Sequence, residues 1–143
     1  MNTEVTKNER GLYIAHIDLG KAIYFDDEIN LILRKLRKEK LYHPRLLYRG
    51  FDGERIDVVK QFGTDIPASN VIWCSDENYF CEKYGDDRSA LRYAQNYVNP
   101  ALSIYDGNKM TRGEDDQEYN FVEGISPLDA LIAVFVLKYK PLV

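Results

Sequence analysis

The chain has 143 residues, which is the size of one ordinary domain, so we expect a single domain over residues 1–143. Hydrophobic residues make up 45% of the chain and charged residues 29%, a balance that excludes a disordered protein. The formal net charge of −4 argues against a surface that neutralises many phosphates, so nucleic acid is not an expected partner.

The sequence lacks the usual signals for membranes, secretion and metal binding. The longest apolar run, Ala130 to Leu137, is too short to cross a membrane, and the first residues lack the apolar core of a signal peptide. We therefore expect a cytoplasmic protein without membrane contact. Cys74 and Cys81 do not form a C-x-x-C pair, and the two histidines stand alone, so we expect reduced thiols and no metal.

The first half of the chain carries the clearest helical pattern. Apolar residues at Ile29, Ile32, Leu33 and Leu36 would line one face of a helix over Lys21 to Leu41. Acidic residues open this segment and basic residues close it, as the helix dipole favours. The sequence therefore predicts an N-terminal helix.

Short elements are predicted in the middle of the chain. Arg45 to Arg49 is extended, Glu54 to Phe62 is helical, and the apolar segment Val71 to Cys74 is typical of a buried strand. Two helices follow, one from Ser75 or Asp76 to about Tyr84 and one from Asp87 to Tyr97, with Leu91, Ala94 and Val98 along one side of the second.

The last third alternates between strands and polar segments. Ala101 to Tyr105 and Glu118 to Val122 are predicted strands, and the polar segment Asp106 to Gln117 between them is a predicted flexible loop. Ser126 begins one helical turn, followed by a strand that ends near Tyr139. This order predicts an α+β fold with a mixed or antiparallel sheet, without the βαβ regularity of a Rossmann fold.

Three segments resemble, in order, the motifs of the ADP-ribosyltransferase superfamily, most closely its poly(ADP-ribose) polymerase branch. They are Leu47-Tyr48-Arg49-Gly50; Ile72-Trp73-Cys74-Ser75-Asp76 with Tyr84 beyond it; and Gln117-Glu118-Tyr119-Asn120-Phe121, with the apolar segment Ala130 to Phe135 beyond it. The resemblance implies split mixed or antiparallel β-sheets with short flanking helices. It also implies transfer of ADP-ribose from NAD to a macromolecular acceptor, one unit at a time.

The resemblance assigns Glu118 the catalytic role. Loss of nicotinamide leaves positive charge on the ribose ring, and a carboxylate stabilises that charge as it does in glycoside hydrolysis. The family's Glu also accepts a hydrogen bond from the ribose and aligns the incoming nucleophile. The alternative is a strand Glu that faces solvent.

NAD binding would fall to the residues around Glu118. Arg49, which replaces the polymerase branch's His as in the toxin-like branch, would hold the pyrophosphate or a ribose hydroxyl, unless it serves in a salt bridge. Gly50 would hydrogen-bond the nicotinamide carboxamide, unless it is simply a turn glycine. Tyr84 and Trp73 would form walls against the ring, although a tyrosine such as Tyr84 could equally belong to the core or its rim. Cys81 stands where the family has a Ser that bonds the carboxamide.

Two further positions carry alternative roles. Ser75 offers another hydroxyl to the nicotinamide, or serves only as a helix N-cap. Asp116 resembles the first acid of the E-x-E pair that receives an arginine target, or belongs to a solvated loop.

The sequence leaves several functions open. Water could replace the acceptor, which would make the protein an NAD glycohydrolase. A catalytically inactive module that binds NAD, ADP-ribose or a protein partner is the main alternative, because the Arg49 and Cys81 positions depart from the family pattern. An RNA 2′-phosphotransferase is disfavoured by the acidic balance.

Overall fold

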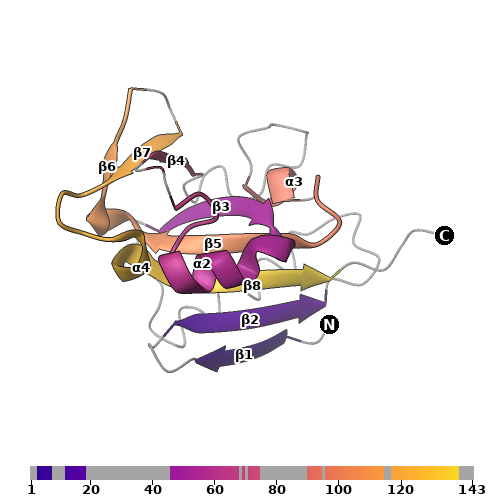
Figure 1. Cartoon of the computed structure of the whole chain (residues 1–143). Helices are drawn as coiled ribbons and strands as arrows, with labels where there is room; N and C mark the ends of the chain where they lie inside the picture. Colours follow the sequence, from indigo (N-terminus) through magenta and orange to yellow (C-terminus); the bar gives the residue numbers. More distant parts are fainter. Residues whose placement is uncertain are drawn as a thin grey trace.

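The computed structural model describes residues 3–7, 12–18, 46–67, 69, 71–74, 90–94, 96–114 and 117–138. These residues form two β-sheets and a few short helices, an α+β arrangement (Figure 1). Within them, no helix is long and apolar enough to cross a membrane.

The strands are β1 (Thr3–Lys7), β2 (Tyr13–Asp18), β3 (Leu46–Asp52), β4 (Val71–Trp73), β5 (Pro100–Asp106), β6 (Met110–Arg112), β7 (Glu118–Phe121) and β8 (Leu131–Lys138). The helices are α2 (Ile56–Phe62), α3 (Ala90–Ala94) and α4 (Pro127–Ala130), with 3-10 turns η1 (Gly53–Arg55) and η2 (Gly107–Lys109).

The larger sheet has five strands in the order β1-β2-β8-β5-β3, and the smaller sheet has three in the order β4-β7-β6. β2 runs parallel to β8, and the other neighbouring pairs are antiparallel. The smaller sheet lies beyond the β3 edge of the larger one (Figure 1). The described strands and helices thus have the α+β character, with mixed and antiparallel sheets, that the sequence predicts.

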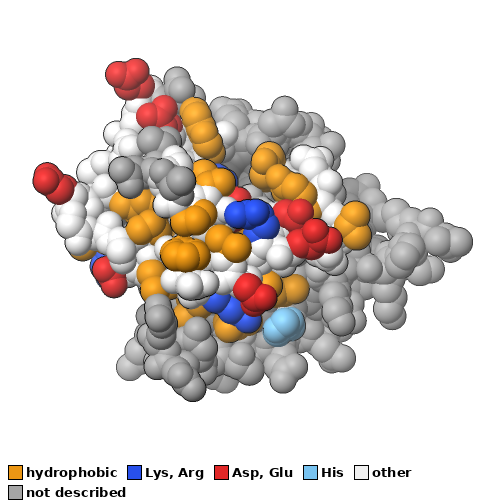
Figure 2. All heavy atoms as spheres, viewed as in Figure 1, with side chains coloured by type: hydrophobic (Ala, Val, Ile, Leu, Met, Phe, Trp, Pro, Cys, Tyr) orange, Lys and Arg blue, Asp and Glu red, His pale blue; other side chains and the backbone are white. Residues whose placement is uncertain are grey.

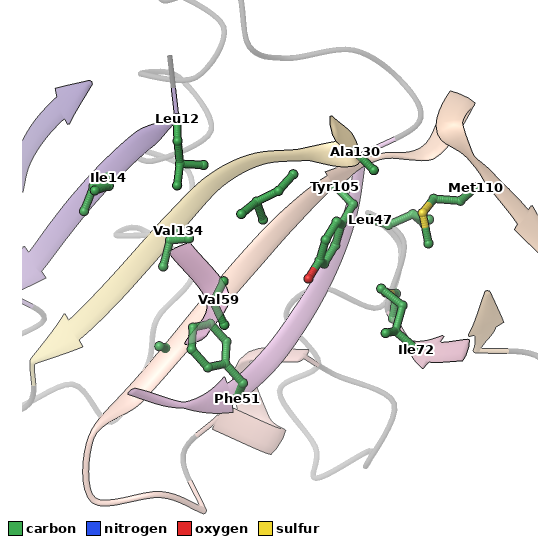
Figure 3. Packing of buried hydrophobic residues seen from close by; sticks show 13 residues of the cluster. Leu12, Ile14, Leu47, Phe51, Val59, Ile72, Tyr105, Met110, Ala130 and Val134 are labelled. Atoms are coloured by element: carbon green, nitrogen blue, oxygen red, sulfur yellow. The ribbon is translucent and has the colours of Figure 1, made fainter. Parts of the chain in front are cut away.

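A continuous hydrophobic core joins the two sheets. Side chains from β2, β3, β5 and β8 pack with Val59 of α2, and the same cluster includes Ile72 of β4 and Met110 of β6 (Figure 3). In β5 the residues from Pro100 to Tyr105 are all buried, so both faces of this strand are covered. Burial of these apolar surfaces is the main favourable contribution to folding.

The turn that ends α2 is tied to the sheet. Gly63 adopts a left-handed conformation with φ of 90°, and its N–H donates to the Val59 carbonyl at 2.7 Å. The Tyr105 hydroxyl of β5 donates to the Gly63 carbonyl at 2.7 Å in a buried hydrogen bond. The direction in which the chain leaves α2 is therefore fixed by a strand of the larger sheet.

Several sequence predictions are confirmed. A strand spans Arg49, a helix ends at Phe62, and Ala101 to Tyr105 lies within β5. Ser126 begins a helical turn: its Oγ accepts from the Asp129 N–H at 3.2 Å, and Pro127 occupies the first turn before β8 starts.

Other predictions are wrong. The segment Asp106 to Gln117 is not one flexible loop, because η2 and β6 form within it and β6 pairs with β7. Val98 is not on a buried helix face: it lies beyond α3 with 95% of its surface exposed. The strands β1 and β2 were not predicted from the sequence.

Two predicted helices, Lys21 to Leu41 and the one that ends near Tyr84, lie outside the described residues.

We expect Gly63→Ala to lower the free energy of unfolding by about 3 kcal/mol. The alanine would have to keep an unfavourable positive φ, and its methyl group would overlap the backbone of Pro127 and Leu128. Gly124→Ala is the matched control, since its φ is +83° but a new Cβ meets nothing within 4 Å. It should cost only about 1 kcal/mol. Urea denaturation measures both, and equal losses would contradict the packing argument.

Candidate functional site

Arg49 is held at the junction of the two sheets. Its Nε and Nη2 atoms donate to the two carboxylate oxygens of Asp65 at 2.8 and 3.3 Å, and Nη1 donates to the Trp73 carbonyl at 3.1 Å. The Arg49 and Asp65 side chains are only 10% and 14% exposed. A strand of the larger sheet, the segment after α2, and a strand of the smaller sheet therefore meet at one guanidinium group.

Asp65 is itself positioned by neighbouring groups. It follows Gly63, whose turn is fixed by Tyr105, and Thr64, which is completely buried. Arg55 donates from Nε to the Asp65 carbonyl at 3.0 Å. The carboxylate that faces Arg49 is thus presented by an ordered segment.

Burial and charge oppose each other at Arg49. Burial alone lowers the pKa of the guanidinium, but the hydrogen bonds and negative charge of Asp65 outweigh it, and the net pKa is raised. The group stays positively charged at any pH at which the protein is folded.

Cys74 follows β4 and is buried beside this ion pair. Burial raises the pKa of its thiol from 9.0 to about 12, even though the positive charge of Arg49 acts in the opposite direction. The thiol is therefore protonated at neutral pH and is not a nucleophile.

Glu118 lies beside Trp73 in the smaller sheet. The two residues are paired between β7 and β4, and the Cys74 N–H donates to the Gln117 carbonyl at 2.9 Å just beyond that pair. Ile72 and Tyr119, the next pair, face the core. Because side chains alternate along a strand, Trp73 and Glu118 share the opposite face. Trp73 is 51% exposed and Glu118 is half-buried.

The side chain of Glu118 lies beside Gly113, the residue that directly follows β6. A Cβ built on Gly113 would stand 2.5 Å from Glu118 Oε1 and 2.6 Å from its Cγ. The carboxylate thus occupies space that a side chain at position 113 would take.

Gly50 has a packing role in the larger sheet. It is buried in β3 opposite Leu102 of β5, and a Cβ there would overlap the Ala90 carbonyl and stand 2.8 Å from the Ala94 nitrogen. The absent side chain lets α3 pack directly on the strand. Any contact between Gly50 and a ligand would therefore be made by its backbone groups.

The structure thus brings together three of the residues singled out in the sequence, Arg49, Trp73 and Glu118, through one hydrogen bond and one strand pair. Ser75, Tyr84 and Asp116, together with Cys81, lie outside the described residues. The salt-bridge alternative for Arg49 is present in the structure, since Asp65 holds two of its nitrogens.

Asp65 was missed in the sequence. Nothing in its local context distinguishes it from the other acidic residues, and the only indication is general: an Arg on a buried strand needs a carboxylate partner. On the face shown in Figure 2, acidic and basic side chains lie among hydrophobic ones. Among the described residues, no three His, Cys, Asp or Glu side chains gather in a way that could hold a metal ion.

No protein-family model, no curated protein and no solved structure matches this chain.

We expect Asp65→Asn to lower the free energy of unfolding by about 2–4 kcal/mol, because it leaves the buried charge of Arg49 without its counter-charge. Asp57→Asn, an exposed substitution on α2 that removes the same charge, should change it by less than about 0.5 kcal/mol. Chemical denaturation of both variants checks this, and a similar small change in each would show that the pair contributes little.

We expect Cys74 to resist thiol reagents in the native protein, because it is buried and its pKa is about 12. In a Cys81→Ser variant, Cys74 is the remaining thiol. It should react with Ellman's reagent at pH 8 only as fast as the protein opens, and at once in denaturant. Rapid reaction of the native protein would contradict the described burial.

The same thiol makes stability depend on pH. Since folding raises its pKa, its contribution to stability is fully present below about pH 9 and is lost as the pH rises toward 12.

Proposed function

We propose that this protein transfers ADP-ribose from NAD to a macromolecular acceptor, one unit at a time, with Glu118 as the catalytic carboxylate. The observation that carries the proposal is the hydrogen bond from Arg49 to the Trp73 carbonyl, together with the pairing of Trp73 and Glu118. Three segments that resemble the family's motifs, and that are far apart in the chain, are neighbours in space.

The arrangement of the sheets also supports the proposal. The resemblance implies split sheets, and the motif segments lie on β3 of the larger sheet and on β4 and β7 of the smaller one. We propose that the fold is the ADP-ribosyltransferase type, with Arg49 at the junction of its two sheets.

The surroundings of Glu118 support this role. Its half-buried side chain shares the sheet face away from the core with the exposed ring of Trp73, and its carboxylate lies against Gly113. When nicotinamide leaves NAD, the positive charge that develops on the ribose is stabilised by a carboxylate, and partial exclusion of water strengthens that interaction. The Trp73 ring offers a flat, rigid surface for a planar group.

Arg49 would meet NAD with the N–H groups that Asp65 and Trp73 leave unused. A guanidinium has five N–H donors, and three of them donate to these two residues. In the proposal, the remaining donors bind the pyrophosphate or a ribose hydroxyl, while Gly50, Ser75 and Tyr84 hold the nicotinamide.

A second candidate function is a catalytically inactive module that binds NAD, ADP-ribose or a protein. The observation that favours it is the ion pair itself. Asp65 accepts from Nε and Nη2 of Arg49, which are donors that an Arg can use to bind a phosphate in a bidentate manner. In that case Arg49 has a structural role, and the replacement of the family's Ser by Cys81 weakens nicotinamide binding.

We expect the purified chain to release nicotinamide from NAD, and Glu118→Gln to slow that release by about 100-fold or more, because the charge that stabilises the transition state is lost. Glu123→Gln, an exposed substitution beyond the same strand, is the matched control and should leave the rate unchanged. Chromatographic detection of nicotinamide measures the three proteins. No release by the unmodified chain, or equal release by Glu118→Gln, would refute the proposal.

Two measurements separate the related possibilities. Radiolabelled NAD that labels a protein acceptor indicates transfer, whereas free ADP-ribose alone indicates glycohydrolysis. Calorimetry that finds saturable NAD binding without turnover would favour the inactive module, and no binding would favour a protein-interaction role.

A further inference from the structure

Gly113 stands directly opposite Glu118 where β6 leads into the connection to β7. Its N–H donates to the Glu118 carbonyl at 2.7 Å, which extends the ladder beyond the pair Arg112 and Tyr119. Gly113 is therefore the neighbouring-strand residue beside the proposed catalytic carboxylate.

The space beside Gly113 is filled by the Glu118 side chain. A Cβ at position 113 would lie 2.5 Å from Oε1, 2.6 Å from Cγ and 2.7 Å from Cδ of Glu118, closer than real Cβ contacts. Those three atoms are the nearest to it, and all belong to one flexible side chain. Any other residue at this position would force Glu118 into a different rotamer.

The backbone does not require glycine at position 113. Among the described glycines only Gly63 and Gly124 have a positive φ, so Gly113 adopts a conformation open to other residues. Elsewhere an added Cβ would meet rigid backbone, as at Gly53, where it would stand 2.5 Å from the Asn99 carbonyl oxygen. At Gly113 the conflict is with a movable carboxylate, so the fold can absorb it.

We propose that Gly113 is a positioning residue that sets the direction of the Glu118 carboxylate. Its missing side chain lets the carboxylate lie against Gly113 itself, on the sheet face that carries Trp73. The catalytic consequence of this inference rests on the proposed function. The structural consequence, a rotation of Glu118, does not.

The test compares Gly113→Ala with the unmodified protein and with Gly124→Ala, whose added methyl meets nothing within 4 Å. We expect Gly113→Ala to lower kcat for nicotinamide release by roughly 10- to 100-fold, because a displaced catalytic group loses its alignment. The Kd for NAD should change less than about threefold, since Glu118 acts mainly on the transition state. Gly124→Ala should keep the full kcat although its melting temperature falls more.

A second measurement reports the rotamer of the Glu118 side chain independently of catalysis. In protein labelled with ¹³C-glutamate and ¹⁵N, three-bond couplings from Glu118 Cγ to the backbone report χ1, with Glu118→Gln used to assign the signal. Gly113→Ala should change these couplings and Gly124→Ala should not. Unchanged couplings in Gly113→Ala would overturn the inference even if the chain releases no nicotinamide, and changed couplings with full kcat would overturn its catalytic half.

Discussion

The ion pair between Arg49 and Asp65, extended by the hydrogen bond to the Trp73 carbonyl, is the contact on which the junction of the two sheets depends. A guanidinium removed from water loses hydration that a single partner does not replace, so it must be surrounded by acceptors. Satisfying it requires the strand that carries Arg49, the segment after α2, and β4 to be in place together. The net stabilisation from such a pair is small, because desolvation opposes it, but the penalty for an incomplete set is large. The main effect of the ion pair is to fix how these three segments lie relative to one another.

That geometry has a chemical consequence at the smaller sheet. β4 has only three residues and is anchored on one side by Arg49 and on the other by its pairing with β7. Trp73 therefore links the positive charge at the junction to the carboxylate of Glu118 through one short strand. A shift of β4 would change the separation of these two groups, which in the proposed function meet the pyrophosphate and the developing ribosyl cation of NAD.

The parts of the fold that could be predicted from the sequence are those with a local signal. β8 is continuously apolar from Leu131 to Leu137, and β5 is apolar from Ala101 to Tyr105 except for Ser103. α4 has its Ser126 cap and Pro127, so each of these elements could be recognised alone. β6 could not, because of its residues only Met110 is buried and the strand exists through its pairing with β7. β2 carries Tyr13 and two isoleucines, a modest strand signal, but its parallel partner β8 lies at the other end of the described chain.

The residues of the candidate site also divide into those with a signal in the sequence and those without one. Arg49 and Glu118 were predicted because their segments resemble family motifs, and the structure describes both of them. Asp65 and Gly113 had no such signal, since the role of each depends on a side chain brought to it by tertiary contacts.

The position of β8 has a last consequence, for folding kinetics. This strand lies between β2 and β5, so the larger sheet stays in two pieces until residues 131–138 have been synthesised and inserted. Pairings with so large a sequence separation raise the contact order, and the late insertion of a central strand makes slow folding with a transiently open sheet the expected behaviour.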